Sequence, residues 1–507
     1  MKEYKLTQQY LGYQSKKDVT NVDVKFLAPG SQNTLINDGE KISASPGYSL
    51  DGPSSPTAGG SNNKYDWTTS KNLERNLRCL KSGKIQYRFV DSVGDVTYRD
   101  LFTFTAGLLP RFAEWWSDTE KDDLLLFVLG DSNMYMWSGG VATVASTTVN
   151  TITKTGTTSW KEEKFLSTGG SNTIVINGVD YAYTGGAGTT TLTGVTPDPS
   201  AVAANSVAHQ KVTTHSNIPA AGLKNNYIGI HKNQIYVGSD SVRGFYISKN
   251  NDYLSYTFSS PRVPGEGAFL TLDAPCKGFV TQEDAMYIAA GKDMWFQVVF
   301  TLSSDNTKEA VNIQKLKSGP RQGAISQELI SQIKNSIIYV SNEPTLDTLG
   351  RVENINTPQS KPLSDPIKPE FKEYNFAGGN TVFFESQTFL SLPGEGIVLI
   401  YDHENQYWQP PQTMNVVLSI IGGKLYGHST VTDETFKLFD TDTYTHNGNP
   451  IESIAAVSYN TFGNRTQQKR FDEYFWEGYA SLETKIDITY KYDFGGFTKV
   501  QEHSQYE

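Results

Sequence analysis

Histidine binds metals and transfers protons near neutral pH, so the seven histidines of the chain are the first candidates for chemistry. They are His209, His215, His231, His403, His428, His446 and His503. No two of them stand four residues apart with a glutamate between them, so the zinc-protease pattern is absent. His428 lies one residue past a Tyr-Gly pair near the end of an apolar run, and we interpret it as a strand-edge residue rather than a metal ligand.

Two short motifs resemble ligand-binding loops but lack essential parts of them. Residues 185–188 read Gly-Gly-Ala-Gly, without the Lys-Ser/Thr pair and the helix start of a phosphate-binding loop, which favours a flexible hairpin tip. Residues 440–444 begin like a calcium loop, but Tyr444 occupies the place of an oxygen ligand. The twelfth position is Ile451 instead of glutamate. We therefore interpret this stretch as a solvated turn between strands.

No catalytic constellation is visible in the sequence. The Ser-x-Asp-x-Gly-x-x-Trp turn of sialidase-like propellers and the Gly-x-Ser-x-Gly nucleophile motif are both absent. No pair of carboxylates is distinguished by its surroundings as acid and nucleophile of a glycosidase. The sequence predicts no catalytic, cofactor-binding or metal-binding residues, no cofactor and no enzymatic activity, and the abundant aromatic residues are expected to pack in a core.

Composition sets further bounds. The 507 residues contain 28 Tyr, 25 Phe and 44 Gly, with few long stretches of helical periodicity, which favours an all-β protein. The formal net charge of −10 gives no basic face for holding nucleic acid, yet it suits a surface that DNA slides past. The two cysteines, Cys79 and Cys276, form neither a disulfide framework nor a zinc site, and the sequence leaves a single bridge between them open.

The element that organises the chain is a recurring hairpin. In residues 227–237, two alternating apolar runs flank the polar pair Lys232-Asn233, a pattern typical of an antiparallel hairpin. Related units recur, and the aromatic residues near their ends, which lie 42 to 52 residues apart, are Tyr236, Tyr287, Tyr339, Phe384 and Tyr426. One propeller blade occupies about 40 to 50 residues, so this period predicts a β-propeller. A large β-sandwich with irregular hairpins is the alternative.

Changes in composition divide the chain into five parts. Residues 1–75 are polar and rich in turns and are expected to form an N-terminal arm, with a plain surface loop as the alternative. Residues 76–140 carry the first propeller strands, and residues 141–212, rich in Thr, Gly, Ala, Ser and Val, are expected to form an inserted small β-domain. The remaining blades are assigned to residues 213–444 and a C-terminal β-sandwich-like module to residues 445–507.

Four local patterns make sharper predictions. The continuous apolar run 124–129 predicts a strand buried on both faces. Asn177-Gly178 predicts a type I′ hairpin turn, since both residues tolerate positive φ. The proline-rich stretch 342–371 is expected to run along a surface. The nearest approach to a helical pattern is residues 326–334, which overlaps a predicted hairpin.

The first residues lack the apolar core of a signal peptide, and no later stretch reaches the length of a membrane span. The sequence therefore predicts a protein that folds in a cytoplasm without a standard translocation signal and without membrane insertion.

Three stretches resemble strands of the propeller tail proteins of tailed bacteriophages, a group that includes tail nozzle or knob proteins and packaged-DNA stabilisation proteins. They are residues 124–140, 278–298 and 398–408. Residues 423–453 are similar to the end of that propeller and its exit into a β-sandwich. The motifs are structural, so no catalytic residue is transferred, and the arm and the loop at 342–371 depart from the expected pattern.

This resemblance implies a non-enzymatic virion component located in the tail and assembled in the host cytoplasm. It would be a homo-oligomeric ring subunit of a nozzle or neck, six-fold by resemblance alone, contacting other tail or neck proteins and transiently the genomic DNA in the exit channel. Two alternatives stay open. One is a receptor-binding or fibre-adaptor tail protein, and the other is a propeller-fold glycan-binding protein or glycoside hydrolase.

Overall fold

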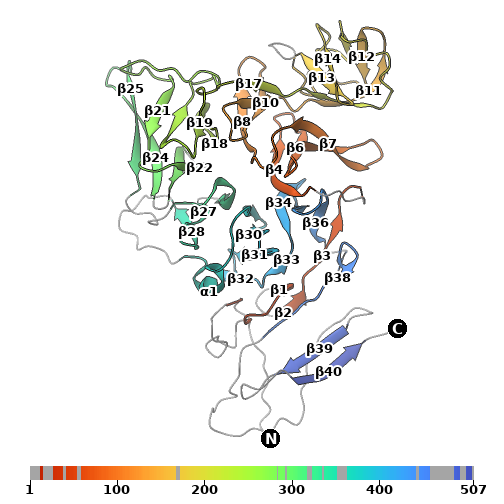
Figure 1. Cartoon of the computed structure of the whole chain (residues 1–507), viewed down its shortest axis with the longest axis vertical. Coiled ribbons are helices and arrows are strands. Elements are labelled where there is room, and N and C mark those ends of the chain that lie inside the picture. Colours follow the sequence, from red (N-terminus) through yellow and green to blue (C-terminus); the bar gives the residue numbers. More distant parts are fainter. Residues whose placement is uncertain are drawn as a thin grey trace. The chain divides into compact units, whose positions relative to one another are not determined.

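The computed structural model describes residues 12–14, 27–37, 41–53, 59–166, 172–282, 284–291, 294–316, 323–333, 336–350, 362–440, 443, 445–456, 485–490 and 498–504. The chain divides into two compact units, one comprising residues 6–459 and the other residues 1–5 with 460–507. The larger unit carries the propeller (Figure 1).

Seven radial antiparallel sheets are present in the described part of the larger unit, and the chain is a β-propeller. Blade 1 contains β4 (Ser61–Thr68), β5 (Glu74–Leu80), β6 (Lys84–Val90) and β7 (Val96–Thr103). Blade 2 contains β8 (Arg111–Ser117), β9 (Asp122–Val128), β10 (Met134–Trp137) and β17 (Thr213–His215). Blade 3 contains β18 (Tyr227–His231), β19 (Gln234–Gly238), β20 (Gly244–Ile247) and β21 (Ala268–Thr271).

The later blades are less regular. Blade 4 contains β22 (Cys276–Gln282), β23 (Ala285–Ala290), β24 (Met294–Leu302) and β25 (Glu309–Lys315). Blade 5 contains β26 (Ile330–Ile333), β27 (Ser336–Val340) and β28 (Leu346–Gly350), preceded by the 3₁₀ turn η2 (Gln327–Leu329). Blade 6 follows η3 (Asp365–Ile367) and α1 (Lys368–Phe371), with β29 (Asn380–Phe384), β30 (Gln387–Leu392), β31 (Ile397–Asp402), β32 (Tyr407–Trp408) and β33 (Gln412–Thr413).

The last blade is completed by a strand from the other end of the chain. Blade 7 contains β34 (Val416–Ile421), β35 (Lys424–Ser429), β36 (Thr435–Asp440) and, at its outer side, β3 (Gly47–Leu50). β3 also contacts the small pair β37 (Thr445–His446) and β38 (Asn449–Pro450). Because β3 pairs antiparallel with β36, hydrogen bonds join the N-terminal region to the end of the propeller.

Two-residue turns with positive φ explain why the recurring hairpins form. Lys232 and Asn233 join β18 to β19 with φ of 48° and 58°. The pairs Glu385-Ser386 and Gly422-Gly423 do the same in blades 6 and 7. Such type I′ turns match the twist of the strands that they connect. The same geometry at Asn177-Gly178 confirms the type I′ prediction, and the fully buried β9 confirms the strand predicted over 124–129.

A six-stranded sheet lies between β10 and β17, in the stretch for which the sequence predicts an inserted β-domain. Its strands follow the order β14-β13-β16-β11-β12-β15. They are β11 (Val141–Thr147), β12 (Thr151–Lys154), β13 (Thr173–Ile176), β14 (Val179–Ala182), β15 (Thr191–Thr193) and β16 (Val207–Gln210). The inserted sheet has an apolar core of its own, which includes Trp160, Phe165 and Leu192.

The structure differs from the predicted arm at 1–75. β3, β4 and the first part of β5 belong to blades, and β1 (Thr34–Asn37) pairs with β2 (Lys41–Ala44). A polar stretch is buried here because its polar groups are satisfied: Asn63 donates from Nδ2 to Pro110 O at 2.6 Å. The composition of residues 1–75 does not show that Pro110, 47 residues after Asn63, supplies such a hydrogen-bond partner.

The structure corrects the prediction for residues 342–371 and describes only part of the predicted C-terminal module. The proline-rich stretch 342–371 does not simply run along a surface, because it contributes β28, and Ile367 and Phe371 are buried in a core. In the predicted C-terminal β-sandwich-like module, residues 451–456 form only an isolated bridge at Ile454. Residues 457–484 lie outside the described residues, and the smaller unit shows β39 (Lys485–Tyr490) paired with β40 (Thr498–Ser504).

The innermost strands form a closed circle of contacts. β8 contacts β18, and the series continues through β22, β26, β29 and β34 to β4. β4 returns to β8 through the stacked rings of Tyr65 and Phe112, whose centroids are 5.1 Å apart. Within the described ranges, no helix has the length and apolar character needed to cross a lipid bilayer.

The seam between blades 7 and 1 is buried and largely polar, whereas apolar clusters join the other neighbouring blades. Arg88 of β6 forms two hydrogen bonds with Asp51, which follows β3, at 2.9 and 3.0 Å. Asp66 of β4 accepts hydrogen bonds from Ser419 Oγ and Ile420 N of β34. The seam that closes the circle therefore depends on directional bonds as well as burial.

We expect Asp51→Ala to lower the free energy of unfolding by roughly 1–3 kcal/mol, because Arg88 would lose its carboxylate partner while remaining mostly buried. Equilibrium urea unfolding followed by tryptophan fluorescence measures this loss. Asp118→Ala is the matched control, since the Asp118 side chain is 49% exposed and lies 3.7 Å from Lys121, so it should change stability by less than about 0.5 kcal/mol. Equal effects of the two variants would show that the seam does not stabilise the circle.

Candidate functional site

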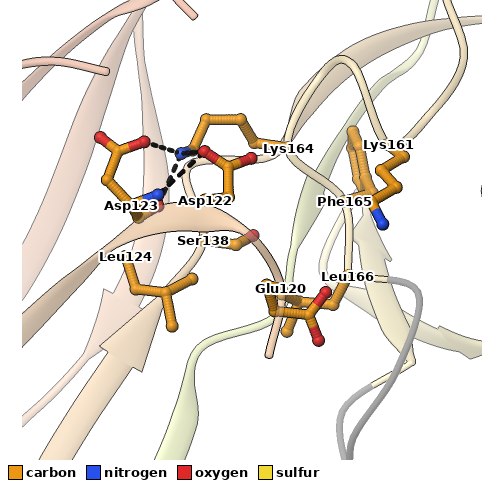
Figure 2. A pocket seen from close by; sticks show the side chains of 9 residues that line it. All are labelled: Glu120, Asp122, Asp123, Leu124, Ser138, Lys161, Lys164, Phe165 and Leu166. Atoms are coloured by element: carbon orange, nitrogen blue, oxygen red, sulfur yellow. Dashed lines mark hydrogen bonds and ion pairs between the residues drawn. The ribbon is translucent and has the colours of Figure 1, made fainter. Parts of the chain in front are cut away.

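A buried ion cluster joins the inserted sheet to the propeller (Figure 2). Lys164, in the insertion, donates from Nζ to Asp122 Oδ1 at 2.7 Å, to Asp123 Oδ1 at 2.5 Å and to Asp123 O at 2.6 Å. Only 1% of the Lys164 side chain is exposed. Both carboxylates stand at the start of β9 in blade 2, so this one ammonium group connects two separately folded sheets.

Blade 1 contributes further partners of the cluster, among them Lys71, whose Nζ lies 2.6 Å from Asp122 Oδ2. Trp67 Nε1 donates to Asp123 Oδ2 at 2.9 Å, and Ser70 Oγ donates to Asp123 Oδ1 at 2.6 Å. Burial by itself would raise the pKa of Asp123, but its interaction with the Asp122 side chain and the hydrogen bonds that Lys164 and Ser70 donate to it outweigh burial and hold that pKa below its usual range. The backbone at Gly139 packs directly against the Trp67 ring because glycine has no Cβ. A Cβ at this position would lie 2.8 Å from that ring, and its φ of +84° also favours glycine.

The ion cluster has no room for a ligand. The cavity beside it, lined by Ser138, Lys161, Lys164 and their neighbours, has a volume of about 10 Å³, which is the space of one water molecule. Every charge at its centre has a partner on the protein. We conclude that this cluster holds the insertion in place and is not a site for a substrate.

One end of the propeller axis is closed by η2. Gln327 Nε2 donates to Ile228 O of blade 3 at 3.0 Å, and Thr381 Oγ1 of blade 6 donates to Glu328 O at 3.3 Å. Glu328 accepts two hydrogen bonds from Arg111 of blade 2, from Nε at 2.6 Å and from Nη2 at 3.1 Å. This short turn, which precedes blade 5, therefore connects three other blades.

Arg111 is the main cation at this closed end. Its guanidinium also donates to Asn226 O at 2.6 Å and lies 4.4 Å from the centroid of the Tyr227 ring. Burial would lower the pKa of Arg111, but the charge of Glu328 reverses that effect and raises it. In the sequence, η2 is indicated only by the weak helical pattern at 326–334. No local pattern predicts its contact with Arg111.

A second cavity lies along the axis next to η2, with a volume of about 300 Å³. Its walls come from the innermost strands of blades 1 to 4 and from β23 and η2. The lining residues are Tyr65, Phe112, Ala113, Glu114, Ile228, Gly229, Ile230, Phe279, Val280, Thr281, Met286 and Gln327. This volume is at the lower end of small-molecule sites, which are typically mostly apolar with a few polar groups.

Glu114 is the single charged residue among those lining this axial cavity. It accepts a hydrogen bond from Tyr65 Oη at 3.0 Å, and its side chain is exposed to solvent. Burial raises the pKa of Glu114, Asp123 adds to that effect, and the Tyr65 hydrogen bond and Lys164 oppose it. Because the side chain is exposed, this shift by itself does not mark a functional site.

The structure does not bring the histidines of the sequence together. His209, His215, His231, His428 and His446 lie in β16, β17, β18, β35 and β37, and His403 follows β31. No group of three or more His, Cys, Asp or Glu with metal-binding geometry occurs among the described residues. The side chain of His503 lies outside the described residues, and Cys79 and Cys276 are both free and buried.

His428 lies inside a strand and is buried at the seam between blades 7 and 1, so its interpretation as a strand-edge residue needs correction. Its Nδ1 lies 2.8 Å from Thr435 Oγ1. Burial, together with the charges of Arg78, Lys64 and Arg88, holds its pKa well below the usual value. The loop 185–188 pairs with Thr193 through Gly185 and buries Ala187, so it is not the flexible hairpin tip that the sequence predicted.

No protein-family model and no curated protein matches the chain. Solved structures of β-propeller proteins are similar to it at low identity. A computationally designed protein, Ika8, is 8% identical over 78% of this chain and 100% of its own, with a TM-score of 0.38. BamB from Moraxella catarrhalis is 8% identical over 75% and 98%, with a TM-score of 0.32. A streptogramin B lyase is 10% identical over 77% and 97%, with a TM-score of 0.34. None of these neighbours is a phage tail protein.

We expect Lys164→Met to lower the free energy of unfolding by about 3–5 kcal/mol, because it leaves the mostly buried Asp123 carboxylate without a cation and Asp122 with Lys71 alone. Urea unfolding measures the change. Lys211→Met is the matched control in the same insertion, since Lys211 pairs with Asp180 where both side chains are about half exposed, and it should cost less than about 1 kcal/mol. Similar losses in both variants would contradict the role of the cluster.

The raised pKa of Glu114 predicts a pH-dependent effect of Glu114→Gln. The ordinary glutamate pKa is 4.5 and the folded value is higher, so native wild-type protein loses stability as the pH rises through that folded pKa. The variant avoids this loss, so it should melt at a higher temperature than wild type at pH 7, with the difference shrinking towards pH 4. Calorimetry at both pH values tests this, and an unchanged difference would contradict it.

Proposed function

We propose that this chain is a non-enzymatic structural component of a bacteriophage virion, a ring-forming subunit of a tail nozzle or neck that contacts other tail proteins. The observation that carries the proposal is the fixed insertion. The buried Lys164 cluster holds a second β-domain against a closed propeller, which is an arrangement suited to presenting protein-binding surfaces in constant geometry. The resemblance of residues 124–140, 278–298 and 398–408 to phage propeller strands supports it.

The inserted sheet offers edges for such contacts. β14 and β15 are the two edge strands of the sheet, and β14 exposes three of its four residues. Isolated bridges of Ala182 with Thr196 and of Thr193 with Gly185 already pair one end of each strand. The backbone groups that remain on the outer sides are ones that another chain can pair with. The inserted sheet is therefore the part of the subunit that we assign to contacts with neighbouring tail proteins.

DNA would not pass through the propeller itself, because η2 and the Arg111–Glu328 pair close its axis. The exit channel in this proposal is bounded by the outer surfaces of several subunits. A net charge of −10 for each subunit is compatible with a wall that repels the DNA backbone and lets the genome slide.

The structure gives less support to the glycoside hydrolase and to the receptor-binding or fibre-adaptor protein. A glycoside hydrolase needs two carboxyl groups about 5 to 10 Å apart, and the residues lining the axial cavity include one carboxylate, Glu114. A receptor-binding or fibre-adaptor protein would use the same rigid frame and differ in its partners. We therefore retain the nozzle or neck subunit as the proposal.

Phage particles produced from a genome that encodes this sequence provide the test. We expect peptide mass spectrometry to find the chain in gradient-purified virions, and cryo-EM of the tail to place it as a ring at the neck or distal end. A peripheral position at the fibre bases would favour the adaptor alternative. Absence from the particles, together with only monomers in native mass spectrometry of the purified protein, would overturn the proposal.

A further inference from the structure

Two of the described histidines have a ring nitrogen that is buried without a hydrogen-bond partner, His428 Nε2 and His446 Nε2. His428 is the more deeply buried of the two, with 1% of its surface exposed, whereas His446 is half-buried. His428 stands in β35 of blade 7 and meets Tyr98 of blade 1, whose ring lies edge-on to the imidazole with the centroids 6.2 Å apart. It therefore lies on the seam that closes the circle of blades.

The closed seam accommodates a neutral His428 ring better than a protonated one. Nδ1 lies 2.8 Å from Thr435 Oγ1, a contact that suits a neutral imidazole in either tautomer. A protonated imidazole donates from both nitrogens, so Nε2 would also become a donor. No acceptor meets Nε2 in the described part of the chain, and a buried donor without a partner is unfavourable, more so when it carries charge.

Blade 1 surrounds His428 with positive charge. Burial lowers the pKa of His428, and the charges of Arg78 in β5, Lys64 in β4 and Arg88 in β6 lower it further. Burial also lowers the pKa of Arg78, and Asp433 is among the charges that oppose this effect. A proton on His428 would therefore meet cations across the seam.

The carboxylates of the seam do not offset these cations at His428. Asp66 lies 2.5 Å from Lys64 Nζ, and Asp51 accepts two hydrogen bonds from Arg88. Over the ranges that the structure describes, no carboxylate raises the pKa of His428.

The remaining titratable groups on the strands around His428 do not supply a negative charge either. Tyr98 of β7 and Tyr426 of β35 are neutral at neutral pH, because burial raises the pKa of both hydroxyls. Lys437 of β36 pairs with Asp440 at 2.8 Å. β34, which pairs with β35, contains only Val, Leu, Ser and Ile.

The other neighbouring blades are joined by apolar clusters. Between blades 2 and 3, for example, Trp115 and Leu126 pack in one cluster with Ile228 and Ile235. The burial of such side chains does not depend on protonation. The seam between blades 7 and 1 is therefore the one at which a proton separates neighbours first.

We propose that the seam between blades 7 and 1 is an acid-operated closure, in which proton uptake by His428 separates blade 7 from blade 1 and opens the circle while the other blades stay packed. Separation lets water reach Nε2 and increases its distance from Arg78, Lys64 and Arg88. This conformational device goes beyond the structural role proposed above and does not depend on it.

The direction of the pH effect follows from the burial of His428. Its pKa in the closed seam lies well below the ordinary value of 6.5, so the neutral ring favours closure. That stabilisation is fully present above pH 6.5 and is lost as the pH falls below it. With an ordinary histidine pKa in the open state, the ratio of open to closed molecules should rise about tenfold between pH 7.5 and pH 5.5.

Electron-spin distance measurements on the full chain test this closure. Cys79 and Cys276 are buried, so nitroxide labels attach to cysteines introduced at exposed positions. Val93→Cys in blade 1 and Lys424→Cys in blade 7 provide such a pair across the seam. We expect a longer distance between these labels at pH 5.5, with its share relative to the closed distance about tenfold greater than at pH 7.5.

A second label pair distinguishes opening of the seam from unfolding of the propeller. Asp118→Cys in blade 2 and Val263→Cys in blade 3 stand on either side of an apolar seam, at exposed positions. This pair should give the same distances at both pH values.

Histidine variants connect the opening with His428. His428→Asn removes the titrating ring and keeps a hydrogen-bonding group near Thr435, so its distances across the seam should not change between pH 7.5 and pH 5.5. His428→Gln provides the same test if the asparagine variant does not fold. His209→Asn is the matched control, because His209 is buried in the inserted sheet, where burial lowers its pKa to about 4, and this variant should open as wild type does.

The proposal is overturned if wild type shows no longer distance across the seam at pH 5.5. It is equally overturned if the labels in blades 2 and 3 separate as well, or if the folded His428 variant opens with the pH dependence of wild type. None of these results bears on whether the chain is found in virions, so the two proposals fail independently.

Discussion

The closure of a circle of sheets is the constraint on which the rest of this fold depends. Successive blades are joined by the chain itself, but the last must meet the first through contacts between distant segments. Here β3 becomes the outer strand of blade 7, and Asp51 beside it binds Arg88 of blade 1. A buried polar seam requires its donors and acceptors to meet with good geometry, so it defines one relative position of the two blades.

The same kind of interaction holds the parts that are not blades. Lys164 joins the inserted sheet to blades 1 and 2, and Glu328 joins η2 to Arg111 across the axis. In each case one charge sits almost fully buried among several partners from distant segments. Removing a partner from such a group costs more than the group contributes to net stability, because the remaining charge stays desolvated. These interactions therefore hold the inserted sheet and η2 in fixed positions against the blades.

Glu114 departs from this pattern and so stands out. Arg111 and Glu328 are buried and paired, while Glu114 is exposed to solvent, with the Tyr65 hydroxyl as its partner and a raised pKa. Because water reaches its carboxylate, Glu114 needs no buried cation to offset its charge, unlike the buried carboxylates that pair with Lys164 and Arg111.

The amino-acid sequence by itself determined the hairpins, since turn pairs such as Lys232-Asn233 and Asn177-Gly178 act locally, and their spacing indicated a propeller. It also showed that no familiar catalytic motif is present. Only the tertiary structure decided that a polar N-terminal stretch supplies β3 and β4, and that Glu114, Tyr65 and Gln327 line one cavity. These residues are up to 262 positions apart in the chain, and burial and pairing at that distance depend on the closed circle rather than on any local pattern.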